Sequence, residues 1–409
     1  MTAGLLFPAL FDRPANTEGV ERHQRRLPQH VLDHYPGGPV LVVIFEDARG
    51  PVLKPDPLRE LPGVGFLRRE GHSVLAVKTL KRDWYRGRPL LDFMGRLAQQ
   101  GFFAAFERVV FYGSSMGGYG ALAFSCLAPR ALVLAYSPQT TLDPALVPWD
   151  TRYPVGSAAD WSGPFADGAV CAASAARVVV VYDPFERSDT RQVARLARHN
   201  LLALKLPFAG HATQPALQQM GQLKVVLPSL LAGTLQAEGF ALAARRRRQL
   251  VEYWVAFARR ARRLSVQQAC LARAEAIDPA TLPALALRAE VTLAAGDPAA
   301  AEAAARQGLA LKPGARRLTE TLIRALQAQG LAEAALAVAQ AALASDPKHL
   351  GFIQPCIRLL LQQGEPAAAQ RVLQAALLRL PLHPRLLQLA REAALPLPAA
   401  TIPAEALPA

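Results

Sequence analysis

The stretch that most constrains the fold of this chain is residues 108–121, which read RVVFYGSSMGGYGA. A short β-branched and aromatic run stops at Gly113 and passes into an apolar segment that ends before Pro129. This pattern predicts a buried strand, a sharp turn and a helix. Gly113, Ser115 and Gly117 satisfy G-x-S-x-G, in which the serine occupies a strained turn and leaves no room for side chains two residues away. The alternative is an ordinary glycine-rich turn with a solvated serine.

Aliphatic runs of strand length occur throughout the first half of the chain, and helical or loop segments separate them. The runs cover residues 39–45, 73–78, 109–112, 131–136, 177–182 and 201–206. Helices are predicted at 90–100, 116–127 and 190–199, the last with Asp189 as its cap. Strands that alternate with helices predict an α/β fold with a doubly wound, mostly parallel sheet. Ligands of such sheets bind beyond the carboxyl ends of the strands, where Ser115 is also predicted to lie.

Two further residues follow predicted strands and complete a chemical set with Ser115. Asp183 comes directly after the fifth predicted strand, and His211 follows the sixth in the run PFAGH. A serine nucleophile needs a base that takes its proton and an acid that holds the base in the correct tautomer. Asp189 is the alternative acid, and Asp183 could instead open a turn, as Asp-Pro often does.

The surroundings of the predicted serine turn supply further candidates. The backbone N–H of Met116 is the predicted oxyanion donor, because it lies at a helix N-terminus where the dipole favours negative charge. A second donor is expected from loop 45–48, without a single residue being singled out. Trp84 and Tyr85 could line a pocket or pack in the core. The loop-like segment 140–169 is either a lid over the site or a surface excursion.

The order Ser115, Asp183, His211, with the run MGG at 116–118 continuing the turn, resembles the α/β-hydrolase superfamily over residues 37–232. The resemblance implies Ser115 as nucleophile, Asp183 as acid and His211 as base, acting on an ester, thioester or amide carbonyl through an acyl-enzyme. It implies no metal and no organic cofactor. Many members place glycine after this strand and aspartate a few residues later, so both alternatives for the acid stay open.

A second pattern begins beyond residue 231, where Ala, Leu, Arg and Gln replace the strand pattern. Prolines recur at 279, 313, 347 and 381, glycines at 296, 330 and 364, and alanines at 301, 335 and 369, always 34 residues apart. This period resembles the tetratricopeptide repeat, although Ala, Leu or Ile mostly replace its large aromatic residues. Segment 245–279 resembles a degenerate first repeat unit. The resemblance implies a protein or peptide partner on a concave surface; the alternative is that the repeats brace the first domain or mediate self-association.

These patterns divide the chain into four segments. They are an N-terminal arm or opening strand at 1–36, the α/β-hydrolase-like domain at 37–232, the helical repeats at 233–384 and a Pro/Ala-rich tail at 385–409.

Composition indicates which kinds of partner and which cellular compartment to expect for the protein. The net charge of +14 comes without a nucleic-acid fold signature, so it predicts solvated surface rather than specific nucleic-acid binding. The arginine run at 245–248 is expected on a solvated helix face, with phosphate or acidic lipid as the alternative ligand. Cysteines at 126, 171, 270 and 356 lack paired spacing, which favours a reducing compartment without a zinc site. The N-terminus lacks signal-peptide features and no apolar run is long enough for a membrane span, so a cytoplasmic location is expected.

The sequence thus predicts a serine hydrolase, of esterase type by base rate, that acts on a small-molecule acyl substrate and carries repeats for protein interaction. The alternatives are a non-catalytic hydrolase-like scaffold or binding protein, and an acyltransferase.

Overall fold

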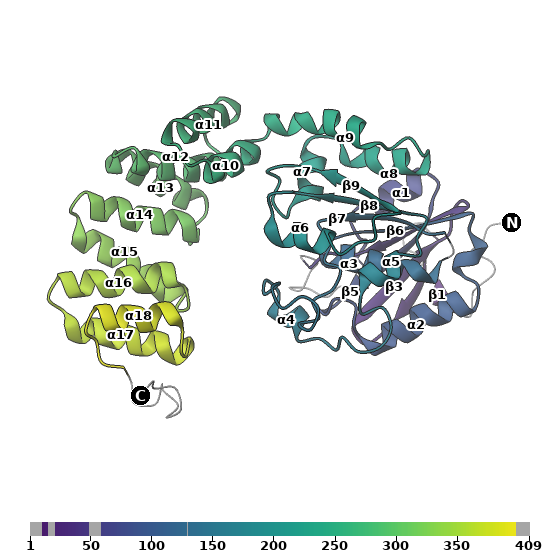
Figure 1. The fold of residues 1–409 in the computed structure, drawn as a ribbon, viewed down its shortest axis with the longest axis horizontal. Helices are drawn as coiled ribbons and strands as arrows, with labels where there is room; N and C mark the ends of the chain where they lie inside the picture. The colour runs from purple at the N-terminus through teal and green to yellow at the C-terminus, as the bar shows by residue number, and fades with distance from the viewer. Residues whose placement is uncertain (1–9, 15–20, 49–58, 129, 398–409) are drawn as a thin grey trace. The chain divides into compact units, whose positions relative to one another are not determined.

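The computed structural model describes residues 10–14, 21–48, 59–128 and 130–397, and the chain divides into two compact units, Met1–Arg247 and Arg248–Ala409 (Figure 1). The predicted N-terminal arm lies partly outside the described residues, as does the end of the predicted tail. The division falls later than the predicted boundary at 232. The reason is that helix α9 (Ala237–Ala243) packs against strand β9 (Leu201–Lys205) and so belongs to the first unit.

The first unit is built on one sheet, which has nine strands within the described part of the chain, in the order β1-β2-β3-β5-β4-β6-β7-β8-β9. The strands preceding β9 are β1 (Asp12–Pro14), β2 (His23–Arg26), β3 (His30–Tyr35), β4 (Val40–Phe45), β5 (Ser73–Thr79), β6 (Arg108–Ser114), β7 (Leu132–Tyr136) and β8 (Arg177–Tyr182). Neighbours from β5 to β9 run parallel, whereas β1, β2, β3 and β5 pair antiparallel. The six predicted strands correspond to β4 to β9. The antiparallel edge is formed by β1, β2 and β3, which lie where the sequence predicts only an arm or opening strand.

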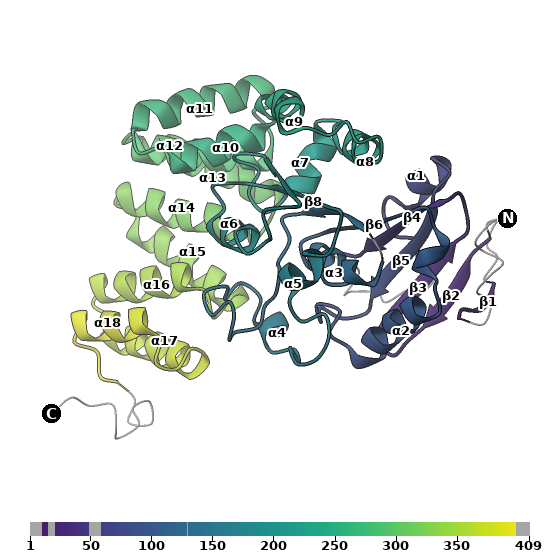
Figure 2. The ribbon, with the colours of Figure 1, turned by 45° about the vertical axis from the view of Figure 1, so that its right-hand side comes forward.

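Helices cover both faces of this sheet, as Figure 2 shows. The helices are α1 (Val64–Arg69), α2 (Arg88–Gln99), α3 (Met116–Ala123), α4 (Pro154–Ser157), α5 (Gly168–Ala172), α6 (Arg187–Val193), α7 (Thr213–Gln219), α8 (Leu223–Leu231) and α9. Successive strand residues point to opposite faces. Val109 and Phe111 of β6 therefore join α2 and α3 in the larger core, whereas Tyr112 faces α7, where Gln214 donates a hydrogen bond to its hydroxyl at 2.8 Å.

The second unit consists of helices α10 (Val251–Arg260), α11 (Leu264–Ile277), α12 (Leu282–Ala294), α13 (Pro298–Leu311), α14 (Arg316–Ala328), α15 (Ala332–Ser345), α16 (Leu350–Gln362), α17 (Pro366–Arg379) and α18 (Pro384–Glu392). From α11 onward, alternate helices begin 34 residues apart, as the sequence period predicts. Gly296, Gly330 and Gly364 adopt positive φ angles directly after the first helix of each pair, where glycine bears no steric cost.

The recurrent alanines of the second unit lie where its helices meet. Ala301, Ala335 and Ala369 are each the fourth residue of the second helix of a pair and have no exposed surface. A side chain this small lets neighbouring helices approach closely, so the sequence period and the packing period have one cause.

Within the described residues, none of the helices has the length and apolarity that a membrane crossing requires.

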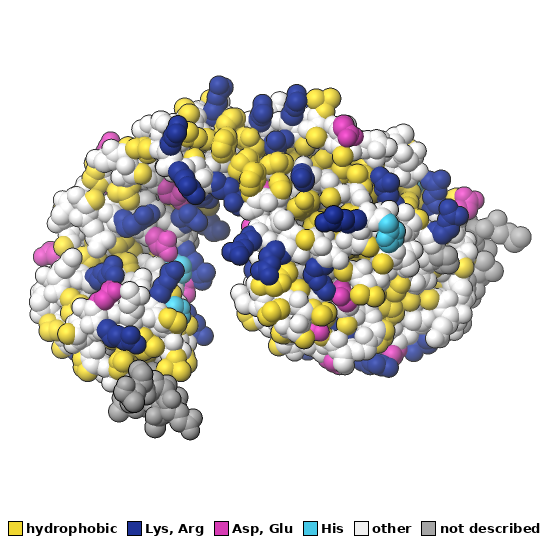
Figure 3. All heavy atoms as spheres, viewed as in Figure 1, with side chains coloured by type: hydrophobic (Ala, Val, Ile, Leu, Met, Phe, Trp, Pro, Cys, Tyr) yellow, Lys and Arg dark blue, Asp and Glu magenta, His cyan; other side chains and the backbone are white. Residues whose placement is uncertain are grey.

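On the face that Figure 3 shows, Lys and Arg side chains lie over both units rather than in one patch. Arg245, Arg246 and Arg248 are exposed, and the run that contains them forms a 3-10 helix over Ala244–Gln249 rather than one stripe of an α-helix. The thiol of Cys126 lies 3.6 Å from the Ala123 carbonyl oxygen, to which it donates, and the nearby thiol of Cys171 lowers the pKa of Cys126.

Candidate active site

Ser115 occupies the turn between β6 and α3, with φ 54° and ψ −118°. Non-glycine residues adopt such angles only when the surrounding structure holds them. A Cβ atom added to Gly113 would lie 2.2 Å from the carbonyl oxygen of Gly117, and one added to Gly117 would lie 2.4 Å from that of Phe45. The close approach of these backbones explains both glycines, and it leaves the serine side chain at the tip of the turn.

A continuous line of hydrogen bonds runs from this serine to a buried carboxylate. The Nε2 atom of His211 lies 2.8 Å from Ser115 Oγ, and its Nδ1 atom lies 2.7 Å from Asp189 Oδ2. His211 sits in the loop after β9, whereas Asp189 sits in the first turn of α6 and has no exposed surface. A carboxylate on Nδ1 favours the tautomer with a proton there and leaves Nε2 as a proton acceptor. The imidazole is thus placed to take the serine proton.

The predicted acid, Asp183, is engaged elsewhere, and this prediction was wrong. Its Oδ1 accepts a hydrogen bond from the backbone N–H of Phe185 at 2.9 Å, and its Oδ2 accepts one from that of Gly210 at 2.8 Å. Asp183 therefore ties together the loops after β8 and β9, which is the turn role that Asp-Pro allows. The predicted start of the next helix was wrong as well. Because α6 begins at Arg187, Asp189 lies inside the helix instead of capping it.

Asp189 also belongs to a buried ionic network. Arg152 donates from Nη1 to Asp189 Oδ1 at 2.7 Å, and from Nε and Nη2 to the two oxygens of Asp150 at 2.8 Å each. Gln192 donates a further bond to Asp150 at 2.9 Å. Burial works to raise the pKa of Asp150, yet the hydrogen bonds from Arg152 and Gln192 outweigh it and lower that pKa. Arg152 is thus fixed by two carboxylates, one of which contacts His211.

The segment 140–169 contributes to this network and is anchored along its length. Arg86 is buried and donates to the backbone carbonyls of Asp160, Ser162 and Pro164 at 2.8–3.0 Å. Arg195 pairs with Asp167 at 2.7 Å. Such bonds hold the segment against the sheet unit, and they bring Arg152 and the residue after it to the serine turn.

That next residue, Tyr153, completes the site and was missed in the sequence. Its hydroxyl lies 3.2 Å from His211 Nε2, the atom that also contacts Ser115 Oγ. The aromatic ring contacts Trp84, with ring centroids 5.2 Å apart, and the guanidinium of Arg152 lies 5.2 Å from the ring centroid. No local pattern marks this tyrosine, because only the long connection after β7 brings it to the histidine.

Trp84 and Tyr85 prove to be buried packing residues. Both have positive φ angles, 50° and 55°, and almost no exposed surface. Trp84 donates from Nε1 to the Gln139 side chain at 3.1 Å and supports Tyr153, whereas the Tyr85 hydroxyl donates to the Glu46 carbonyl. Burial raises the pKa of Tyr85 well above its usual value, so this phenol stays protonated.

The N–H of Met116 opens α3, and the first N–H groups of a helix have no acceptor within it. It is therefore placed for an oxyanion formed at Ser115. In the loop after β4, the N–H of Glu46 already donates to the Val77 carbonyl at 3.2 Å. This bond removes Glu46 from the candidates for the second donor.

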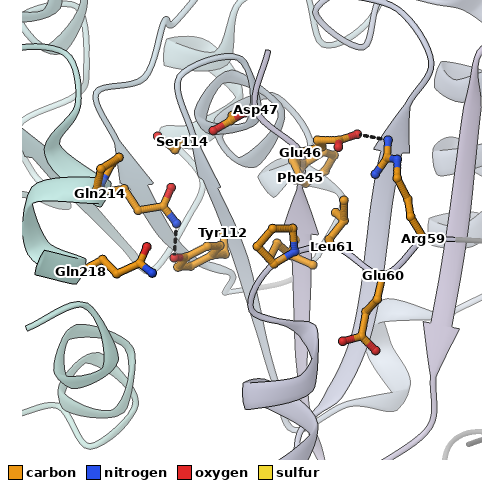
Figure 4. A pocket seen from close by; sticks show the side chains of 13 residues that line it. Phe45, Glu46, Asp47, Arg59, Glu60, Leu61, Tyr112, Ser114, Gln214 and Gln218 are labelled. Atoms are coloured by element: carbon orange, nitrogen blue, oxygen red, sulfur yellow. Dashed lines mark hydrogen bonds and ion pairs between the residues drawn. The ribbon is translucent and has the colours of Figure 1, made fainter. Parts of the chain in front are cut away.

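A pocket lies beside the serine turn, where β4 and β6 end (Figure 4). Tyr112 and Gln214 form one wall with their mutual hydrogen bond, and Glu46 and Arg59 form another with an ion pair of 2.7 Å. Ser114, rather than Ser115, belongs to its lining. Across the described part of the chain, no group of three or more His, Cys, Asp or Glu residues could hold a metal ion.

Comparison with known proteins identifies the second unit. Residues 326–393 match the tetratricopeptide repeat family. Solved structures similar to this chain include the translocator chaperone SycD of Yersinia enterocolitica (24% identity, 28% of this chain and 86% of that one, TM-score 0.26) and the tetratricopeptide repeat protein TTC0263 of Thermus thermophilus (21%, 35% and 80%, 0.31). Another is YrrB, a repeat protein with an unusual peptide-binding site (15%, 44% and 90%, 0.32). No curated protein matched the chain. The chain thus joins a mixed α/β unit to tetratricopeptide repeats, which are protein-interaction modules.

Proposed function

We propose that the first unit is a serine hydrolase of the α/β-hydrolase type, with Ser115 as nucleophile, His211 as base and Asp189 as acid. The observation that carries the proposal is the pair of hydrogen bonds at 2.8 and 2.7 Å that joins the three side chains. Structural serines need no such arrangement, whereas an activated serine needs a base within reach and an acid behind it.

The geometry supports a two-step reaction on an ester, the most common substrate class for such a site. Ser115 Oγ attacks the carbonyl carbon while its proton moves to His211 Nε2, and the N–H of Met116 stabilises the oxyanion. The alcohol then leaves with a proton and an acyl-serine remains. Water attacks the acyl-serine by the same proton route and restores the free serine.

The position of each group in the sheet supports the superfamily assignment. Ser115 follows the interior strand β6, Asp189 follows β8 and His211 follows β9. In this chain order the serine comes first, the acid second and the histidine last, as α/β-hydrolases require. All three lie at the carboxyl ends of parallel strands, which is where ligands of such sheets bind.

Labelling with a fluorophosphonate probe tests the proposal, because the probe bonds only to an activated serine. Wild type is expected to be labelled, and Ser115→Ala and His211→Ala are expected to lose the label. Ser114→Ala is the matched control and should keep it, since that serine faces the neighbouring pocket. A folded wild type that resists the probe would contradict the proposal and favour a scaffold whose function rests on the repeats. Product analysis with added alcohols then separates hydrolysis from acyl transfer.

A further inference from the structure

The hydroxyl of Tyr153 lies near His211 Nε2, the same atom that contacts Ser115 Oγ. The proposed reaction of Ser115, His211 and Asp189 assigns no role to this hydroxyl. Tyr153 Oη lies 3.2 Å from His211 Nε2, and Ser115 Oγ lies 2.8 Å from the same atom. A neutral imidazole nitrogen has one lone pair, so both hydroxyls compete to donate to it. Tyr153 is thus, beside Ser115, a second hydroxyl within hydrogen-bond distance of Nε2 and can exchange a proton with it.

The environment of Tyr153 keeps the phenol neutral and its ring in place. Burial raises its pKa, and the opposing effect of Arg152 does not cancel that rise. The ring contacts Trp84, which is buried, and Arg152, which is held by Asp150 and Asp189. A neutral phenol fixed in this way can donate one hydrogen bond while it accepts another.

Resting on the proposed hydrolase function, we propose that Tyr153 is a catalytic residue that passes the proton from His211 to the leaving oxygen of the substrate. After attack, Ser115 Oγ is bonded to the carbonyl carbon and is a poor acceptor, so Nε2–H turns to Tyr153 Oη. As the carbon–oxygen bond of the ester breaks, Oη–H passes to the departing oxygen and Oη takes the proton from Nε2. The alcohol leaves with the proton that began on Tyr153, and Tyr153 ends with the proton that began on Ser115, so its hydroxyl is restored.

This role predicts that the contribution of the Tyr153 hydroxyl to kcat/KM depends on the leaving group of the ester. A 4-nitrophenolate departs without protonation, whereas an ethoxide needs a proton as it leaves. General acid assistance contributes about 10²-fold or more to a step that needs it. Loss of the hydroxyl should therefore spare activated esters and slow unactivated ones.

The test compares the 4-nitrophenyl, phenyl and ethyl esters of one short acid in wild type, Tyr153→Phe and Tyr182→Phe. Phenylalanine keeps the ring contacts and removes only the hydroxyl, and Tyr182→Phe removes a buried phenol from the end of β8 as a control. We expect Tyr153→Phe to change kcat/KM by less than about threefold for the 4-nitrophenyl ester and to lower it by about 10²-fold for the ethyl ester. The control should change neither.

Other outcomes would overturn the inference. Equal losses on all three esters would mean that Tyr153 only positions His211, and no loss would mean that its hydroxyl takes no part. A gain on every ester would mean that Tyr153 obstructs the site. Fluorophosphonate labelling separates these results from failure of the hydrolase proposal, because fluoride departs without a proton. A Tyr153→Phe protein labelled at the wild-type rate has an intact serine, whereas a wild type without Ser115 labelling removes the basis of both proposals.

Discussion

The two aspartates after β8 offer a matched pair of substitutions that separates the acid from a structural carboxylate. In Asp189→Asn, the amide oxygen should face Arg152, because Arg152 Nη1 donates to the Oδ1 position at 2.7 Å. The amide nitrogen must then face His211 Nδ1, 2.7 Å from the Oδ2 position. Two donors cannot share that contact, so Nδ1 must become an acceptor. The proton moves to Nε2, which can then no longer accept from Ser115.

The expected loss follows from that tautomer. Holding the imidazole in the wrong tautomer costs about 10⁴-fold in kcat in a serine protease triad, or about 5.5 kcal/mol in the barrier. We expect a loss on the order of 10³- to 10⁴-fold here. In Asp183→Asn, one of the two backbone N–H groups loses its acceptor, at a cost of about 1–3 kcal/mol in the free energy of unfolding. Activity should stay within about tenfold of wild type.

The assay pairs steady-state ester hydrolysis with urea denaturation of both variants. Asp189→Asn should lose activity with its fold intact, and Asp183→Asn should lose stability with most of its activity retained. The argument would be refuted if folded Asp183→Asn were as inactive as Asp189→Asn, or if Asp189→Asn hydrolysed esters at the wild-type rate.

Three further predictions concern the scaffold. Gly117→Ala places a Cβ atom against a backbone carbonyl, so we expect it to lower the free energy of unfolding by about 1–3 kcal/mol and to abolish activity. The control Gly95→Ala lies inside α2 with open space around it and should raise the free energy of unfolding by about 0.5–1 kcal/mol. Equal effects of the two substitutions in thermal unfolding would contradict this prediction. Arg86→Met leaves three loop carbonyls without their donor, so we expect it to lower the free energy of unfolding by about 3 kcal/mol and to expose the segment before α5 to proteolysis. The control Arg88→Met removes an exposed side chain and should lower the free energy of unfolding by less than about 0.5 kcal/mol. Equal cleavage rates in the two variants would show that Arg86 does not hold this segment in place. Burial, reinforced by the neighbouring His23, lowers the pKa of His34 from 6.5 to about 3. Between these pH values the unfolded chain binds a proton that the folded chain does not, so the free energy of unfolding falls as the pH drops from 6.5 to about 3. His34→Phe should make the free energy of unfolding less dependent on pH in this range, and an unchanged slope would refute the prediction.

The parts of the fold that the sequence predicted are those with local causes. Strands β4 to β8 appear as aliphatic runs because they are buried on both faces, whereas β9, at the edge of the sheet, is only partly buried. The serine turn appears because backbone contacts admit only glycine at 113 and 117. The 34-residue period survives in sequence because each helix pair repeats the same contacts. The antiparallel strands β2 and β3 carry charged and histidine residues, including Asp33, whose buried carboxylate pairs with Lys78 of β5, so no aliphatic run marks them.

The sequence favoured Asp183 over Asp189 as the partner of His211 because it shows where a strand ends but not what an oxygen contacts. Asp183 stands at the strand end, yet both of its oxygens are used by the turn that it opens. Asp189 becomes available because α6 starts earlier than its sequence indicates, which turns a residue of the first helical turn toward His211. Arg152 then fixes that carboxylate from a segment that enters the site from between β7 and β8. Since the contacts of Asp189, Arg152 and Tyr153 join distant parts of the chain, spacing alone could locate Ser115 and His211 but not the groups that contact His211 or fix its carboxylate partner.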